Sequence, residues 1–324
     1  MKKEVLCLWD ITAEQKAGLI ATGKDLCNFT FASGRTVTKE QAQNAEIIFG
    51  NISADLIQGS SKLKWLQLNS AGTDQYVASG KLPSTVILTN ASGAYGQSVA
   101  EHMFAVLCML MKNLHLYRDD QNNAVWSDHG TVSTLLDSHI LINGLGDIGE
   151  YFARLCKNMG AYTVGLKRHA SAKPDCLDEL YTNEMLDSLL PSADVVVSIL
   201  PNTKETAGLW TLQKFSQMKS TAFFINAGRG NAVNQDDLYT ALFKHMIAGA
   251  GIDVTVPEPL PASSKLWTLP NLVITPHIAG EYHLPATFIR IFDIAKHNLS
   301  LYLENKPLIN EVDFSTGYRK FSAI

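Results

Sequence analysis

The sequence has few cysteines, no marked excess of one charge and no long apolar run. Its five cysteines are odd in number and scattered, and no C-x-x-C spacing occurs, which argues against a disulfide framework and a metal site. The net charge of −4 argues against nucleic acid as the main partner. The longest apolar run, Met103–Met111, has nine residues, about half of the ~20 that span a bilayer, so no membrane partner is expected.

The amino-terminal segment predicts a strand and not a targeting signal. Met1–Glu4 leads directly into the apolar run Val5–Trp9, which Asp10 ends and which is too short for the apolar core of a signal peptide. A chain without such a signal and with scattered cysteines fits a reducing compartment. We therefore expect a cytoplasmic protein.

Length and composition indicate two globular domains. The 324 residues exceed what one ordinary core accommodates, and 46% apolar with 18% charged residues is typical of a soluble globular enzyme. Short apolar segments alternate with helical patterns, which predicts parallel sheets with helices on both faces. Strands are expected at Glu4–Trp9, Ala45–Gly50, Leu63–Leu68, Thr85–Leu88, Ile140–Asn143, Tyr162–Leu166, Asp194–Leu200, Thr221–Asn226, Ala250–Val254 and Leu272–Thr275. Helices are expected at Thr12–Ala21, Ser98–Leu116, Ile148–Met159, Gln235–Lys244 and Pro285–Glu304.

The alternation predicts an α/β chain with two doubly wound parallel-sheet domains, the larger of them a Rossmann dinucleotide-binding domain. The six strands expected after residue 139 place this larger domain over residues 100–280. Residues 1–99 and 281–324 would form a substrate domain into which it is inserted. The helix expected at Ser98–Leu116 is apolar around most of its circumference, so it should be buried on most sides and could pack against both domains.

A glycine-rich loop lies between an expected strand and an expected helix. It reads Gly144-Leu145-Gly146-Asp147-Ile148-Gly149. The first glycine permits a tight turn, the second lets backbone approach a pyrophosphate, and the third lets helix and strand pack closely. Because the amino end of the helix also attracts phosphate, this context predicts a dinucleotide site that includes Asp147 and Ile148.

The next strand ends in basic residues. An NAD site usually has an acid there to hold the ribose hydroxyls, but this chain has Lys167 and Arg168. These two side chains would attract the 2′-phosphate that an acid would repel. We therefore expect NADP ahead of NAD as the cofactor.

Three later segments carry polar residues where strands end. They are Asn226–Gly230, Asp253–Pro259 and Thr275–Gly280. In an open parallel sheet, the carboxyl ends of the strands converge on the ligand crevice. An arginine, a carboxylate and a histidine are therefore expected to meet beside the nicotinamide.

These motifs together resemble the D-isomer-specific 2-hydroxyacid dehydrogenase family, in its glyoxylate/hydroxypyruvate reductase-like form. The resemblance covers almost the whole chain and is densest between Asn90 and Gly280. It is carried by Ser98–His102, the glycine loop, Leu200–Thr206 and the three strand-end segments. Several motifs in the right order are more specific than any one of them.

The resemblance implies roles for particular residues. Arg229, Glu258 and His277 would be catalytic, and Asp253 would help to hold the nicotinamide amide. The loop Asn69–Thr73 would bind the substrate carboxylate through consecutive backbone N–H groups, which need no charged side chain. The substrate contacts would then come from Ser70, Ala71, Gly72, Arg229 and His277. Further dinucleotide contacts would come from Leu200, Pro201, Thr206, Ala227, Gly228 and Gly280. A homodimer is implied in the same way.

The residue types suit reduction of a small 2-oxo acid to a D-2-hydroxy acid. Histidine is the natural proton donor near neutral pH, and the neutral ring would be the base in the oxidation direction. A neighbouring carboxylate would orient His277 and favour its charged form. Arg229 would bind the substrate carboxylate and polarise the carbonyl.

Other functions stay open at this point. One is a non-catalytic dinucleotide-sensing binding protein, resembling the corepressor in the same family. Within the enzyme class, 3-phosphoglycerate is a second substrate candidate. Formate dehydrogenase is also a relative, but the pairing of Glu258 with the Thr275-Pro276-His277 segment favours the hydroxyacid reaction.

Overall fold

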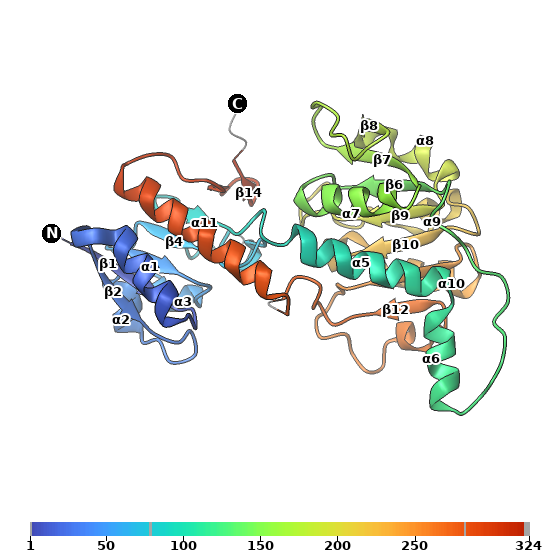
Figure 1. Ribbon diagram of the computed structural model, residues 1–324, viewed down its shortest axis with the longest axis horizontal. Coiled ribbons are helices and arrows are strands. Elements are labelled where there is room, and N and C mark those ends of the chain that lie inside the picture. Colours follow the sequence, from blue (N-terminus) through green and yellow to red (C-terminus); the bar gives the residue numbers. More distant parts are fainter. Residues whose placement is uncertain (1, 78–79, 282, 321–324) are drawn as a thin grey trace. The chain divides into compact units, whose positions relative to one another are not determined.

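The computed structural model describes residues 2–77, 80–281 and 283–320 (Figure 1). The chain divides into two compact units, residues 1–94 with 284–324, and residues 95–283. The long helix α5 (Gly96–Met111) belongs whole to the second unit, whereas the domain boundary expected at residue 99 falls inside it. None of the helices in the described part of the chain has the length and apolar character needed to cross a bilayer.

The first unit contains one parallel sheet of five strands in the order β2-β1-β3-β4-β5. This order is that of doubly wound, flavodoxin-like sheets. The strands are β1 (Lys3–Cys7), β2 (Cys27–Phe31), β3 (Ile47–Phe49), β4 (Trp65–Gln67) and β5 (Ile87–Thr89). The helices are α1 (Ala13–Gly23), α2 (Lys39–Asn44), α3 (Ala54–Ile57), α4 (Asp74–Val77) and α11 (Pro285–Leu303), and a short antiparallel pair, β13 (Val312–Asp313) and β14 (Tyr318–Arg319), follows.

The second unit contains a parallel sheet of seven strands in the order β12-β11-β10-β9-β6-β7-β8. The chain moves outward in one direction from β6 to β8 and in the other from β9 to β12, which is the doubly wound dinucleotide-binding topology that the sequence predicts. The strands are β6 (His139–Asn143), β7 (Tyr162–Lys167), β8 (Glu179–Thr182), β9 (Val195–Ser198), β10 (Phe223–Asn226), β11 (Gly249–Ile252) and β12 (Leu272–Ile274). The remaining helices are α6 (Leu114–Asn122), α7 (Asp147–Asn158), α8 (Leu186–Leu189), α9 (Leu212–Gln217) and α10 (Gln235–Phe243).

Helix α5 packs closely on the sheet of the second unit. A Cβ atom on Gly251 of β11 would lie only 2.3 Å from Val106 of α5, so the absence of a side chain there permits this approach. The opposite face of the sheet carries an apolar core that includes Trp210, Phe215 and Phe224. Both faces are therefore covered, as the nearly continuous apolar strands require.

Two details differ from the sequence prediction. The helix expected to run to Leu116 breaks after Met111, because Asn113 adopts a left-handed backbone with φ of 54° that a helix interior cannot contain. The edge strands β2 and β8 were not expected, so each sheet has one strand more than the sequence predicts.

Candidate functional site

The three predicted strand-end segments lie side by side in the second unit. They follow β10, β11 and β12, which are consecutive neighbours in the parallel sheet. The first two loops touch, since a Cβ atom on Gly230 would lie 2.3 Å from the backbone of Thr255. These segments therefore converge at the carboxyl ends of three neighbouring strands, as the sequence predicts.

Glu258 and His277 form a hydrogen-bonded pair across two of these loops. The Nδ1 atom of His277 lies 2.8 Å from Oε2 of Glu258, and Oε1 of Glu258 accepts a hydrogen bond of 3.0 Å from the Thr255 N–H. The His277 side chain is 51% exposed and that of Glu258 is 39% exposed, so solutes can reach the pair. His277 also has a left-handed backbone with φ of 54°, which is uncommon outside glycine and often found at functional sites.

Asp253 anchors the loop that carries His277. Its buried carboxylate accepts hydrogen bonds from the Thr275 hydroxyl at 2.6 Å and from the N–H groups of Ile278 and Ala279 at 3.0 and 3.1 Å. Its carbonyl accepts from the N–H of His277 at 2.8 Å. A carboxylate has about four acceptor positions, so one is left for the nicotinamide amide that the resemblance assigns to it.

Arg229 lies at the beginning of the short 3-10 helix that follows β10, and it is half-buried. Its Nη1 donates a hydrogen bond of 2.8 Å to the carbonyl of Gly228. Gly228 in turn fits against the backbone of Leu200, where a Cβ atom would come within 2.5 Å. The segment that holds Arg229 is thus packed directly on the segment after β9.

The glycine loop has the geometry that a dinucleotide requires. Gly144 has φ of 109° and a Cβ atom on it would lie 2.4 Å from the carbonyl oxygen of Ile199, while one on Gly149 would lie 2.7 Å from that of Gly144. Gly146 has open space around it and begins α7 without a side-chain cap, which leaves the first N–H groups of the helix available to an anion. The residues present therefore fit a pyrophosphate.

Asp147 and Ile148 are the two loop positions that lie within the first turn of α7 between Gly146 and Gly149. Ile148 is half-buried in the first turn of α7. The carboxylate of Asp147 lies against Gly96 at the beginning of α5, where a Cβ atom on Gly96 would come within 2.5 Å of it. Only the backbone of Asp147 is thus directed to the predicted phosphate site.

Lys167 and Arg168 stand at the carboxyl end of β7, next to the glycine-loop strand β6. Arg168 is exposed and donates from Nε to a ring nitrogen of His169 at 3.1 Å, and Lys167 donates to the Ser171 hydroxyl at 3.3 Å. A hydrogen bond from the Thr203 side chain and the charge of Arg168 hold the pKa of Glu205 below its usual range. Arg168 thus lies within electrostatic reach of the turn that follows β9.

That turn contains Pro201 and Thr206. The Thr206 hydroxyl donates to the carbonyl of Pro201 and accepts from the N–H of Thr203 at 2.9 Å, which closes the turn.

Two further predicted cofactor residues lie after other strands. Ala227 follows β10, and its N–H donates to the carbonyl of Ser198 at 3.2 Å. Gly280 lies beside Tyr95 and Val99.

In the first unit, the predicted substrate loop is held by its carbonyl groups. The carbonyls of Ser70, Ala71 and Gly72 accept from the Ala91 N–H at 3.0 Å, the Asn90 side chain at 2.8 Å and the Ser70 hydroxyl at 2.7 Å. Within the described residues, neither the N–H of Ala71 nor that of Gly72 donates a hydrogen bond. Those two groups remain available to an anion.

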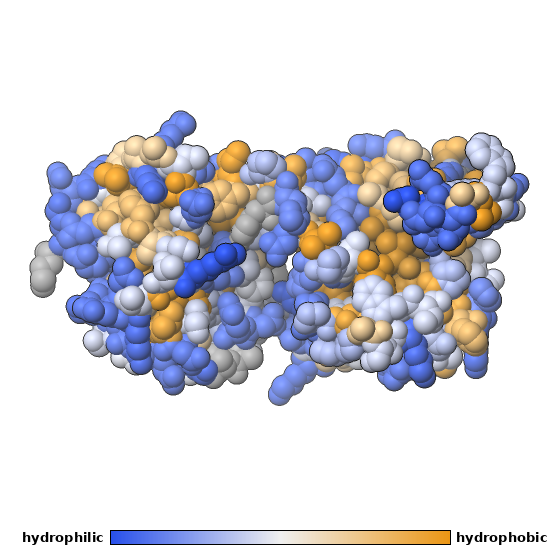
Figure 2. Space-filling model, turned by 90° about the horizontal axis from the view of Figure 1, so that it is seen from below, coloured by the Kyte–Doolittle hydropathy of each residue, from blue (hydrophilic) through white to orange (hydrophobic). Residues whose placement is uncertain are grey.

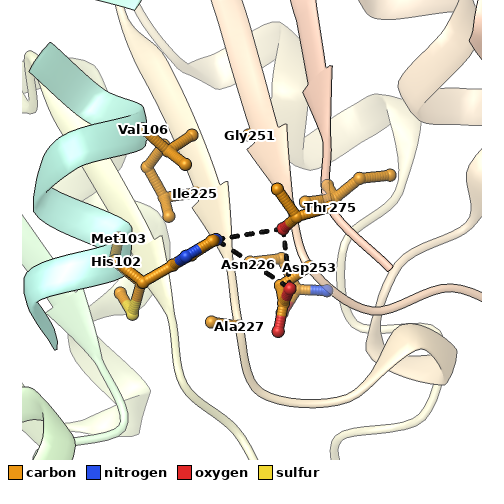
Figure 3. Close-up of a pocket in the computed structure, with 10 residues that line it drawn as sticks. His102, Met103, Val106, Ile225, Asn226, Ala227, Gly251, Asp253 and Thr275 are labelled. Carbon is orange, nitrogen blue, oxygen red and sulfur yellow. Dashed lines mark hydrogen bonds and ion pairs between the residues drawn. The ribbon is translucent and has the colours of Figure 1, made fainter. Parts of the chain in front are cut away.

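His102 was not singled out from the sequence, although it lies in a motif that the resemblance uses. It projects from α5 toward Thr275 and Asp253 and lines a small cavity of about 10 Å³ (Figure 3). A cavity of this size has room for about one water molecule. The contacts of His102 with Thr275 and Asp253 join residues far apart in the sequence, so the sequence alone does not reveal them.

The described residues contain no cluster of three or more His, Cys, Asp or Glu side chains arranged to hold a metal ion. All five cysteines are free thiols.

On the face drawn in Figure 2, apolar side chains reach the surface as patches between hydrophilic ones. Exposed apolar side chains in the second unit include Leu114, Val125, Trp126, Val132, Leu136 and Met159.

Comparison with known proteins adds to this geometry. The family profile described as D-isomer specific 2-hydroxyacid dehydrogenase, NAD binding domain, matches residues 104–279. A glyoxylate reductase/hydroxypyruvate reductase of Homo sapiens is 40% identical over 182 residues, which are 55% of this chain and 54% of that protein. The chain thus matches about half the length of this relative.

Two solved structures are similar over nearly the whole chain. A D-isomer specific 2-hydroxyacid dehydrogenase family protein from Aeromonas salmonicida is 32% identical, with a TM-score of 0.85, covering 97% of this chain and 100% of that one. A D-isomer specific 2-hydroxyacid dehydrogenase from Xanthobacter autotrophicus, in complex with NADPH and MES, is 26% identical, with a TM-score of 0.80, covering 98% and 100%.

Proposed function

The chain belongs to the D-isomer specific 2-hydroxyacid dehydrogenase family, and we propose that it is an NAD(P)-dependent enzyme that reduces a small 2-oxo acid such as glyoxylate or hydroxypyruvate to the corresponding 2-hydroxy acid, of D configuration where that product is chiral. One observation carries the proposal. Nδ1 of His277 lies 2.8 Å from Glu258 at the edge of the sheet where the ligand crevice of this fold is found. This hydrogen bond supports the proposal that His277 is a general acid and that Glu258 orients it.

His277 is the proton donor in this proposal. Since a carboxylate can only accept, Nδ1 carries a proton and the second ring nitrogen, Nε2, is left for the substrate. When bound, the nicotinamide supplies the hydride for the carbonyl carbon. Protonated Nε2 of His277 gives its proton to the carbonyl oxygen, and Glu258 stabilises the charged ring until then.

Arg229 and the loop Ser70–Gly72 bind the substrate in this proposal. The guanidinium group would pair with the substrate carboxylate and draw electron density from the carbonyl oxygen. For the loop in the first unit, we propose that the N–H groups of Ala71 and Gly72 bind an anionic group of the substrate, since the loop carbonyls are already engaged within that unit.

The cofactor is NADP or NAD, and we propose NADP as the preferred one. Lys167 and Arg168 end the strand at which an NAD site would carry an acid. The Xanthobacter autotrophicus structure, which is bound to NADPH, supports this preference. Dinucleotide contacts are proposed for the glycine loop, Leu200, Pro201, Thr206, Ala227, Gly228, Asp253 and Gly280.

The proposal is tested with two matched histidine variants. His277 and His245 both have left-handed backbones, with φ of 54° and 51°, and asparagine tolerates that conformation. His277→Asn should lower kcat for NADPH-dependent glyoxylate or hydroxypyruvate reduction by about 10²–10⁴-fold, whereas His245→Asn should leave it unchanged. Equal activity of the two variants would contradict the role of His277.

The quaternary structure and location are further parts of the proposal. The exposed apolar side chains on the second unit, with Trp126 fully exposed, fit a homodimer whose partner covers them. Light scattering on the purified protein should then give twice the mass of the 35.5 kDa chain.

The proposed location is the cytoplasm, and fractionation of the source cells should find the protein there. If 3-phosphoglycerate is oxidised better than any small hydroxy acid, the substrate proposed here is wrong.

A further inference from the structure

A chain of hydrogen bonds joins His102, Thr275 and Asp253 (Figure 3). It begins on α5 at His102, whose Nε2 atom lies 3.0 Å from the hydroxyl oxygen of Thr275. The Thr275 hydroxyl lies 2.6 Å from Oδ1 of Asp253, and Nε2 of His102 lies 3.9 Å from the same oxygen. Three segments far apart in the sequence are joined in this way within the second unit.

The direction of these hydrogen bonds follows from the number of protons. Oδ1 of the Asp253 carboxylate can only accept, so the single proton of the Thr275 hydroxyl points to it. The Thr275 oxygen must then accept from His102, which requires the proton of that ring to be on Nε2. The contact at Thr275 thus selects one tautomer of His102.

The far end of the chain of bonds determines the backbone of His277. Asp253 accepts from the N–H groups of Ile278 and Ala279, and its carbonyl accepts from that of His277. His277 has an unfavourable left-handed φ of 54°, which persists only where surrounding contacts impose it. Asp253 supplies these contacts, because it accepts hydrogen bonds from Thr275 before His277 and from Ile278 and Ala279 after it.

We propose that His102 is a positioning residue for His277, acting through Thr275 and Asp253. This rests on the proposed function only in taking His277 as the proton donor. The His102 side chain is 24% exposed, and its Nε2 atom is within hydrogen-bond distance of the Thr275 hydroxyl. Without that donor, the Thr275 hydroxyl loses its fixed orientation and the loop that carries His277 loosens.

Two pairs of variants separate the hydrogen bond from mere packing. His102→Leu removes the donor, whereas His102→Gln keeps an N–H donor at a similar distance along the side chain. Thr275→Val removes the hydroxyl at nearly constant shape, whereas Thr275→Ser keeps it. Loss of positioning should lower kcat about tenfold in His102→Leu and Thr275→Val, with little change in KM for NADPH. The conservative variants His102→Gln and Thr275→Ser should keep a kcat close to that of the unaltered protein. Equal kcat in all four variants and the unaltered protein would overturn the proposal.

A second readout does not depend on catalysis. Hydrogen exchange of the peptide that covers residues 275–280 should be about tenfold faster in His102→Leu and Thr275→Val than in the unaltered protein, but not in the Gln and Ser variants. Unchanged exchange in Thr275→Val would contradict the positioning role even if the protein reduced no 2-oxo acid. If exchange responds as expected but the unaltered protein is inactive, the proposed function fails and the loop anchor stands.

The catalytic consequence is tested by combining the changes. In the His277→Asn background, the residual activity should not fall further when His102→Leu is added, because the residue being positioned is already lost. A further tenfold loss in that background would mean that His102 acts on something other than His277, and the proposal would then be wrong.

Discussion

Glu258 is held from two sides, with Oε1 on the Thr255 N–H at 3.0 Å and Oε2 on Nδ1 of His277 at 2.8 Å. The first bond belongs to the loop of Glu258 itself, so the carboxylate is oriented before any ligand arrives. The second bond keeps a proton on Nδ1. Nε2 is then a donor when the ring is charged and an acceptor when it is neutral, as the proposed reduction and its reverse require.

Glu258→Gln keeps the shape of the side chain but removes its charge. We expect kcat for 2-oxo acid reduction to fall roughly 10- to 100-fold, because the charged form of His277 loses its carboxylate partner. Steady-state kinetics with NADPH at saturating cofactor checks this. Glu184→Gln, at an exposed glutamate of the same unit, is the control and should behave as the unaltered protein. A fully active Glu258→Gln variant would rule out the pairing as a catalytic feature.

Replacing Lys167 by Asp and Arg168 by Ala together should change the cofactor preference. The variant loses two charges that attract a 2′-phosphate and gains an acid that can bind ribose hydroxyls. The ratio of kcat/KM for NADPH to that for NADH should fall by about tenfold or more. Lys244→Ala, at an exposed lysine after α10, should leave the ratio unchanged. If the double variant keeps the original ratio, Lys167 and Arg168 do not determine the preference.

Gly144→Ala should disturb both stability and cofactor binding. Its Cβ atom would lie 2.4 Å from the carbonyl oxygen of Ile199, in a backbone with φ of 109°. We expect the unfolding free energy to fall by about 1–3 kcal/mol, measured by denaturant unfolding. We also expect weaker NADPH binding, measured by fluorescence titration. Gly59→Ala is the matched control, because Gly59 also has a positive φ, of 79°, but nothing lies within 4 Å. Equal losses in the two variants would show that contact at Gly144 is unimportant.

Asp194 makes the stability of the second unit depend on pH. Burial raises the pKa of its carboxyl, but the His139 N–H at 2.9 Å and Lys219 at 2.7 Å outweigh burial and hold it below its ordinary 3.8. A carboxyl with a lowered folded pKa stabilises the fold above its unfolded pKa, and this stabilisation is lost as pH falls through the folded value. Asp194→Asn should therefore lower Tm by about 2–4 °C at pH 7, with the difference shrinking below pH 3.8. A Tm difference that does not vary with pH would exclude this linkage.

The sequence predicts most of the fold because the central strands are fully buried. Val195–Ser198 and Phe223–Asn226 are buried at every position and form unmistakable apolar runs. In the two parallel sheets, the strands that the sequence does not predict are Cys27–Phe31 and Glu179–Thr182, which lie at sheet edges and are half-exposed. Edge strands carry polar residues, so no apolar run marks them.

The proximity of His277 and Glu258 was predictable, because each lies in a segment that follows a strand and parallel strands bring their carboxyl ends together. The acceptor bonds of Asp253 and the donor role of His102 were not predictable. They depend on distances between α5 and the loops after β11 and β12, which no spacing along the chain expresses. Asp253 in particular anchors the His277 loop, in addition to the cofactor contact proposed for it.

The most direct test of the account is the rate at which the purified protein oxidises NADPH and NADH with glyoxylate, hydroxypyruvate, pyruvate and branched 2-oxo acids. The account predicts turnover of at least one small 2-oxo acid, a higher kcat/KM with NADPH than with NADH, and a product of D configuration where the product is chiral. Absence of turnover with every acid and both cofactors would contradict it.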